Sequence, residues 1–461
     1  MLINILTTTY IFHDFHLFLE RKIKTVIIMS AKIQLKNEKT GTFGGIFLTL
    51  DFFDQFGLTK LIDNELKSRG LKSKYSYSDI VKNLSAIFLC GGDVIEDINM
   101  FRNDVFAVNP AYRFCSADTI LRSFSELAVD NINVVSESGI KYAFNVNDTL
   151  NSLLIKCLLK CQLLGDLDDL VLDYDNQLIE TDKYDARYSY KGKNGYFPGI
   201  AQINNHPAYI ENRDGNANVK TDQAETLKRM FGHFIENNIR IKKVRLDCGS
   251  YAKNIVEVID ADDRIFYVRA QQCASLHKRF EEELSSEDWK DVEINYHRCQ
   301  LASLPFTSFL SHKGYRLVVQ RTLIKDEQST LFDSYIYRTI LTNDTTSSEE
   351  KIVRFYNQRG CSEQTFDIMN NDFGWSHLPC SFMMQNVVFM TFTAIIKNFY
   401  TTLMLKLSQK DNFQKEFALT ATSRLKRFIF RIVQVPFKWV HGSKEWVLQL
   451  FTSRPYDILQ T

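Results

Sequence analysis

The sequence predicts an α/β fold, with helical regions on either side of a segment in which strands and helices alternate. Two observations support this. Hydrophobic residues recur at helical spacing over residues 30–165 and again after residue 346, whereas residues 167–271 contain short strand-like runs separated by amphipathic helical segments. With 461 residues, 45% of them hydrophobic, the chain can bury a sizeable core and is long enough for two to four structural units.

Residues 29–165 are expected to form a helical N-terminal domain. Hydrophobic residues lie at helical spacing in Phe47–Phe56, Tyr77–Cys90 and Thr119–Leu127. Residues 1–28 differ, because Asp14 interrupts their apolar run and they show neither the basic start nor the cleavage site of a signal peptide. We expect residues 1–28 to be a non-native or disordered leader, with Met29 as the natural start.

The alternation is clearest in residues 166–271. Strand-like runs occupy residues 167–175, 196–203, 207–215, 242–249 and 264–271, and helices are expected from Thr221 onward and over 250–261. Three strands, a helix, a strand, a helix and a strand is the order of elements in an RNase H-like sheet. We therefore expect this segment to be the first part of an RNase H-like core.

The alternation breaks at residue 272. Residues 272–345 contain β-rich segments separated by polar loops, which we interpret as an inserted sheet. A long helix is then expected from Ser347, so residues 346–407 should complete the core.

The longest apolar stretch runs from Asn386 to Leu407. It has Lys397 and Asn398 at its middle, where a charged side chain is costly in a bilayer. A buried core helix is therefore favoured over a membrane span, and we expect no membrane association.

Charge is unevenly distributed although the net charge is only +1. Residues 401–461 contain ten Lys or Arg against four Asp or Glu, and we expect residues 408–461 to form a basic helical tail. One predicted helix in this tail carries Arg424, Lys426, Arg427 and Arg431, with Phe428 and Phe430 between them. This basic face is either solvated or bound to an anionic partner, and the two interpretations are equally supported.

Nine cysteines are scattered along the chain without a CxxC pair. Cys157 and Cys161 stand one helical turn apart, but no further His or Cys nearby completes a zinc site. We expect buried free thiols and a cytoplasmic location, because the pattern does not resemble a secreted disulfide framework.

Acidic residues close two of the predicted strands. Asp173 and Asp175 end the first strand, and their spacing of two places both side chains on the same face of the sheet. Asp247 ends the fourth strand, and strand ends of this kind form the functional crevice of α/β sheets. A single Asp at a strand end is more often a turn or capping residue. Together the three predict a metal site, because converging carboxylates repel one another unless a hard cation such as Mg²⁺ lies between them.

A fourth acidic residue, Glu363, belongs to the segment YNQRGCSE (356–363). Tyr356, Arg359 and Glu363 are three and four residues apart, so on a helix they share one face. Such a face can bind a metal through Glu363 and hold a phosphate group through Arg359 and Tyr356. The alternative is an intrahelical Arg–Glu pair worth about 0.2–0.5 kcal/mol, and the upstream aspartates favour the metal site.

In combination these segments resemble the DDE transposases of bacterial insertion sequences, and within them the group named for insertion sequence 1380. The likeness covers roughly residues 40–405. The matching parts are LDYDNQ (172–177), VRLDCGSY (244–251), the Tyr356–Arg359–Glu363 spacing, CSADTILRSF (115–124) and FGWSHLPCSFMMQNVVFM (373–390). The three-part spacing is specific, whereas any one part is not.

Two positions depart from the family's pattern. The Lys that closes its third motif falls on Asn370, so a phosphate contact there loses its charge or a nearby Lys supplies it. The first motif often reads D-x-D-x-T in the family, whereas Asn176 and Gln177 follow Asp175 here. We therefore favour Asp175 as the first member of the triad, with Asp173 as the alternative.

The resemblance implies an enzyme that cleaves DNA at the inverted repeats of its own element and transfers the ends into target DNA. Asp175, Asp247 and Glu363 would hold two Mg²⁺ ions, for which Mn²⁺ could substitute. Arg359 and Tyr356 would position the DNA backbone. The family works as a dimer on paired element ends, which implies a homodimer here.

Further DNA contacts are expected outside the triad. The helical N-terminal domain either binds DNA or serves as a packing scaffold. Asn370 and the basic side chains of Arg424, Lys426 and Arg427 are further candidates for DNA contact. Trp289 in the β-rich insertion is a candidate for stacking on an unpaired base, although a core position is the commoner role for Trp.

Three other functions are compatible with the sequence. One is an RNase H-like nuclease that cleaves DNA without strand transfer. Another is a catalytically decayed transposase that acts as a DNA-binding protein, for which Asn370 is an early sign. The third is a helical interaction scaffold, for which EDTA should have no effect on any DNA reaction.

Overall fold

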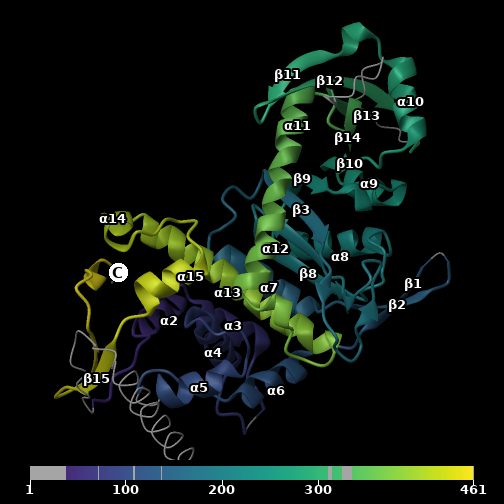
Figure 1. The fold of residues 1–461 in the computed structure, drawn as a ribbon. Helices are drawn as coiled ribbons and strands as arrows, with labels where there is room; N and C mark the ends of the chain where they lie inside the picture. Colours follow the sequence, from purple (N-terminus) through teal and green to yellow (C-terminus); the bar gives the residue numbers. More distant parts are fainter. Residues whose placement is uncertain are drawn as a thin grey trace, which may run out of the picture. The chain divides into compact units, whose positions relative to one another are not determined.

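The computed structural model describes residues 38–459 except 71, 107–108, 137, 310–313 and 324–334, and the leader expected over residues 1–28 lies outside this part. Residues Gly41–Thr461 form one compact unit. It is built on an 11-stranded sheet with the order β1-β2-β8-β7-β3-β9-β10-β14-β13-β12-β11 (Figure 1). The α/β fold predicted from the alternation is confirmed as a large mixed sheet with helices.

The centre of the sheet consists of the five strands predicted between residues 167 and 271. They are β3 (Leu170–Asn176), β7 (Gly199–Ile203), β8 (His206–Arg213), β9 (Ile241–Leu246) and β10 (Ile265–Arg269). β9 runs parallel to both β3 and β10, while β7 is antiparallel to β3 and β8. Helix α8 (Gln223–Glu236) precedes β9 and α9 (Lys253–Asp260) follows it, as the sequence predicted.

Hydrophobic patterning explains why β3 lies at the centre. Leu170, Leu172 and Tyr174 are almost completely buried, and so is the intervening Asp173. A strand covered on both faces loses the alternation of buried and exposed residues, as in parallel sheets generally. The polar end of β3, from Asp175 onward, is therefore the part that reaches an open edge.

The β-rich segment after residue 272 extends the central sheet. Its four strands are β11 (Lys290–Ile294), β12 (His297–Phe306), β13 (Tyr315–Leu323) and β14 (Tyr335–Thr342). They form an antiparallel meander, and β14 pairs with β10. The β-rich insertion expected after residue 272 is therefore present as strands that continue the central sheet, with β14 pairing along the edge of β10. Helix α10 (Ala274–Glu283) precedes the meander, and α11 (Glu349–Asn357) packs on it through Ile352 and Val353.

The N-terminal region is helical, with one exception. Its helices are α2 (Gly45–Gln55), α3 (Leu58–Leu66), α4 (Tyr77–Leu89), α5 (Asp97–Asp104), α6 (Ala117–Leu127) and α7 (Asp148–Lys160). The hairpin of β1 (Ile132–Val135) and β2 (Lys141–Asn145) was not predicted, and β2 joins the sheet beside β8. The region shares one hydrophobic core with the sheet.

Helix α13 (Met383–Ser408) is the predicted core helix. By length and composition it could cross a membrane, but 94% of its most apolar window is buried within the protein. Its polar side chains are bonded internally: Asn398 Nδ2 donates to the Pro207 carbonyl at 2.9 Å, and Lys397 Nζ donates to the Asn205 carbonyl at 2.9 Å. These contacts join α13 to the start of β8.

The C-terminal tail is only partly helical. It contains α14 (Phe413–Phe417) and α15 (Leu425–Phe428), the latter continued by a π-helical turn, Ile429–Val433. The antiparallel hairpin of β15 (Phe437–His441) and β16 (Trp446–Leu450) follows, so the expectation of an entirely helical tail is wrong. Short β-branched and aromatic segments such as FKWVH form strands when a partner is close.

A three-stranded sheet of β4 (Ile179–Glu180), β5 (Arg187–Tyr188) and β6 (Asn194–Tyr196) fills the connection between β3 and β7.

The eight cysteines whose side chains are described are all free thiols, as predicted, and six of them are buried. Cys248 and Cys273 are exposed, contrary to the expectation of burial.

Candidate active site

Two neighbouring parallel strands bring Asp175 and Asp247 to the same edge of the sheet. In the register of β3 and β9, Asp173 lies opposite Arg245 and Tyr174 lies opposite Leu246. Asp175 and Asp247 are the next residue on each strand, and Asp247 leads into the 3-10 turn Cys248–Ser250. The two aspartates therefore lie at the carboxyl ends of parallel strands, where α/β proteins place their functional crevice.

The third acidic residue, Glu363, lies in the first turn of α12 (Cys361–Asp372) and is exposed. The prediction that residues 356–363 form one continuous helix is wrong. Helix α11 ends at Asn357, and the 3-10 turn Gln358–Gly360 separates it from α12. Gly360 lies in this interruption, and glycine is a poor helix former. The turn presents Arg359 to β3.

Asp175 is the most strongly perturbed acid at this edge. Arg359 Nη2 lies 2.7 Å from its Oδ2, and the backbone N–H of Asn176 donates to its Oδ1 at 2.9 Å. Burial raises the pKa of Asp175 to about 6, the Arg359 guanidinium opposes this rise, and the carboxylates of Asp247 and Glu363 add to it. Asp247 and Glu363 thus each lie within electrostatic reach of Asp175.

Asp173 has a different role. Its carboxylate accepts two hydrogen bonds from the Arg245 guanidinium, at 2.7 and 2.6 Å, and its side chain is 2% exposed. Arg245 also donates to the Phe355 carbonyl at 2.8 Å. Asp173 therefore helps to join β3, β9 and α11, and this bidentate pair disfavours it as a member of the triad. Arg245 was missed from the sequence because only the β3–β9 register shows that it faces Asp173.

Tyr356 is buried and 4% exposed. Its hydroxyl donates to the Leu246 carbonyl at 2.9 Å, and the Arg269 guanidinium lies over its ring. The predicted phosphate contact is not available to this hydroxyl in the described arrangement. Tyr356 instead holds the end of α11 against the last residue of β9, next to Asp247.

The donor set suits a hard divalent cation in its chemistry, because all three acids offer carboxylate oxygens. Within the described residues, however, no group of three or more His, Cys, Asp or Glu side chains is arranged to hold a metal ion. Arg359 compensates Asp175, and Glu363 is exposed.

Two other residues predicted to contact DNA are poorly suited to it: Trp289 is buried, and Asn370 is uncharged and half-buried. Trp289 is 8% exposed, and the Arg321 guanidinium lies 3.9 Å from its ring centroid. The base-stacking role suggested for Trp289 is therefore disfavoured, because its ring is already packed. Asn370 is half-buried on α12, and its backbone carbonyl accepts a hydrogen bond from Ser376 Oγ at 2.7 Å.

The basic residues of the tail differ in their contacts. Arg424 forms ion pairs with Asp367 at 2.6 Å and Asp372 at 2.8 Å, so it joins the tail to α12. Arg427 is exposed and donates to the Ala418 carbonyl at 2.9 Å, while Lys426 is exposed. Of the three predicted contacts, Arg424 is thus already neutralised within the protein.

The transposase DDE domain family, group 1, matches residues 30–459. The chain belongs to this family. A search of curated proteins finds none that matches this chain. A cryo-EM structure of a piggyBac transposase synaptic complex with hairpin DNA is similar at a TM-score of 0.41 and 11% identity, over 87% of each chain. The family match includes the N-terminal helices and the C-terminal hairpin of the transposase as well as its sheet.

Proposed function

We propose that this transposase cleaves DNA at the ends of its own element and joins them to target DNA, with Asp175, Asp247 and Glu363 as the metal-holding triad. The observation that carries the proposal is their convergence: β3 and β9 end side by side, and the carboxylates of Asp247 and Glu363 both raise the pKa of Asp175. The strand order β8-β7-β3-β9-β10 supports an RNase H-like core for this site.

Each residue at the edge has a defined part in this proposal. The three carboxylates would hold Mg²⁺, or Mn²⁺ in its place, which polarises the phosphodiester and lowers the pKa of bound water. Arg359, once released from Asp175, can donate to a phosphate oxygen of the bound strand. Asp173 and Tyr356 keep the ends of β3 and β9 in register with α11.

The test uses a labelled duplex that carries the DNA immediately flanking the gene, where the proposed function expects inverted repeats. Wild-type protein with Mg²⁺ should cleave it, and Asp247→Asn and Glu363→Gln should each lower the rate by about a thousandfold or more, since metal binding contributes several kcal/mol to such reactions. Asp169→Asn is the matched control, because Asp169 lies at the opposite end of β3 and pairs with Lys243 at 2.8 Å. Cleavage by Asp247→Asn at the wild-type rate would overturn the proposal.

The same assay separates the alternative functions. Cleavage without joined products would favour the nuclease that does not transfer strands. Binding of the duplex without cleavage by the wild-type protein would favour a decayed, DNA-binding transposase. We further propose a homodimer that holds two element ends, which light scattering of the protein–duplex complex tests directly.

A further inference from the structure

The loop between α3 and α4 is strongly basic. Residues 67–76 read KSRGLKSKYS, with four Lys or Arg, three Ser and no acidic residue. Lys67, Lys72 and Lys74 are exposed. The loop therefore presents a cluster of positive charge with hydroxyl groups between the basic side chains.

One buried side chain and two exposed hydrogen bonds anchor this loop on either side of residue 71. Arg69 is 8% exposed and donates two hydrogen bonds to Glu126 of α6, at 2.7 and 2.8 Å. Arg113 Nη1 donates to the Lys74 carbonyl at 3.1 Å, and the Ser73 hydroxyl donates to the Tyr75 carbonyl at 2.9 Å. These anchors reduce the entropy that Ser73 and Lys74 lose when a partner binds here.

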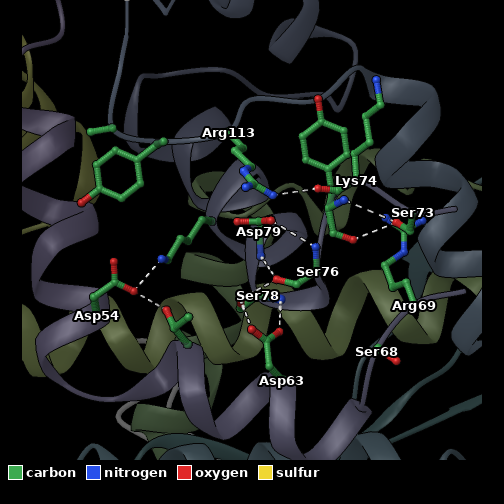
Figure 2. A pocket seen from close by; sticks show the side chains of 15 residues that line it. Asp54, Asp63, Ser68, Arg69, Ser73, Lys74, Ser76, Ser78, Asp79 and Arg113 are labelled. Carbon is green, nitrogen blue, oxygen red and sulfur yellow. Dashed lines mark hydrogen bonds and ion pairs between the residues drawn. The ribbon is translucent and has the colours of Figure 1, made fainter. Parts of the chain in front are cut away.

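Two open cavities, each of about 510 Å³, lie against the loop. Both are lined by Arg69, Ser73, Lys74 and Tyr75. The first is also lined by Ser68, Ser76 and Arg113, which are labelled in Figure 2 together with acidic residues discussed below. The second adds Lys72, Thr119 and Arg122. The surface is therefore a pair of concave, hydroxyl-lined hollows with the basic loop between them.

The acidic residues that line these cavities are engaged within the protein. Arg69 pairs with Glu126, and Lys82 pairs with Asp54 at 2.5 Å. Asp63 accepts hydrogen bonds from Ser78, and Asp79 accepts one from the Ser76 backbone N–H, which caps α4.

Once the ion-paired residues are set aside, the cavities are lined by four exposed basic residues and by two acids, Asp63 and Asp79, which accept hydrogen bonds from serines. The basic residues are Lys72, Lys74, Arg113 and Arg122. Lys, Arg and Ser side chains together are the groups that contact DNA phosphates. A membrane-binding surface would also expose large apolar side chains. None of the exposed large hydrophobic residues among those described lines either cavity.

We infer that this surface, named here the α3–α4 basic surface and made of Lys72, Ser73, Lys74, Arg113 and Arg122, binds the phosphate backbone of duplex DNA. It lies on elements other than those that carry the triad. The choice of DNA as partner rests on the proposed function. The contacts are with phosphates, so binding is independent of base sequence and sensitive to salt.

The experiment measures anisotropy of a fluorescein-labelled duplex of random sequence between about 50 and 200 mM KCl. The full chain carrying Asp247→Asn serves as the parent, so the measurement does not depend on cleavage. The triple variant Lys72→Ala, Lys74→Ala, Arg122→Ala should bind at least tenfold more weakly at low salt. The slope of log Kd against log salt should fall by about 2–3, since each phosphate contact contributes about 0.9.

The matched control removes three exposed lysines that already pair with a Glu on their own helix, namely Lys228, Lys253 and Lys278. It should leave both affinity and slope unchanged. An equal loss in the control, or an unchanged slope in the triple variant, would overturn the inference. So would loop-dependent binding to phosphatidylserine vesicles with no binding to the duplex. Loop-dependent duplex binding by a parent whose wild-type form never cleaves would support the inference while the proposed function fails.

Discussion

The guanidinium of Arg359 lies 2.7 Å from the carboxylate of Asp175, between Nη2 and Oδ2, and both side chains are largely buried. The pair joins the turn between α11 and α12 to the end of β3. It also places a positive charge where the proposed divalent cation would bind. The protein thereby compensates the charge of Asp175, which Asp247 and Glu363 would otherwise leave in a strongly negative environment.

Replacing Arg359 by Gln should destabilise the fold and increase the rise in Tm that Mg²⁺ causes. Loss of the guanidinium leaves a buried carboxylate without its countercharge, which costs about 3 kcal/mol. A divalent cation can restore that charge, so Mg²⁺ should raise the Tm of Arg359→Gln more than that of the wild type. Thermal unfolding with and without Mg²⁺ measures this. Arg298→Gln, at an exposed position of β12, is the control, and equal stabilisation of all three proteins would contradict the prediction.

Asp173→Asn should act on stability rather than on the chemistry. Its carboxylate and the Arg245 guanidinium are 2% and 7% exposed, and removal of one partner from such a buried pair costs about 3–5 kcal/mol. Denaturant unfolding should show this loss, and the double variant Asp173→Leu, Arg245→Met should recover part of it because no unpaired charge remains. Full stability with abolished cleavage would instead return Asp173 to the triad.

The acid sensitivity of the fold should depend on His206. Burial lowers the pKa of His206 to about 3, and the ammonium of Lys397, whose Nζ lies 3.5 Å from its Nδ1, acts in the same direction. In the unfolded chain His206 takes up a proton near its ordinary pKa of 6.5, whereas in the folded protein it stays neutral at that pH. The stabilisation from His206 is therefore complete above about pH 6.5 and is lost progressively as the pH falls towards 3.

Between pH 8 and pH 5 this group should account for a loss of about 2 kcal/mol. His206→Asn keeps a polar side chain but does not titrate, so the stability difference between wild type and variant should change by that amount over the interval. Urea unfolding at each pH gives the comparison. Parallel pH profiles for the two proteins would show that His206 does not carry the effect.

Trp289→Ala should lower stability without a specific effect on DNA. The ring packs under the Arg321 guanidinium and is 8% exposed, so its removal leaves a cavity that costs about 3–5 kcal/mol. Trp289→Phe, which keeps an aromatic face for Arg321, should lose much less. Duplex binding by folded protein at low temperature should match the wild type. Normal stability combined with defective processing of the DNA ends would support the base-stacking role.

Several parts of the candidate site followed from the sequence because they depend on local patterning. The run LVLDYDN has strand character and ends in acids, and KVRLDCG repeats that arrangement, so Asp175 and Asp247 could be placed at strand ends. Amphipathic periodicity identified α8, and the long apolar stretch from Asn386 to Leu407 identified α13. The short strands β1, β2, β15 and β16 were missed because each is too brief to show a period and forms only where a neighbouring chain segment supplies hydrogen bonds.

By itself the sequence determined the order of strands and helices in the core and the two acids, Asp175 and Asp247, at strand ends, because hydrophobic periodicity acts over short distances along the chain. Only the tertiary structure decided which side chain each acid contacts. Parallel pairing of β3 with β9 set Asp173 against Arg245, and the break in the helix at residues 358–360 turned Arg359 towards Asp175. Those partners are 72 and 184 residues apart, so their contact depends on sheet register and packing, which no local pattern encodes.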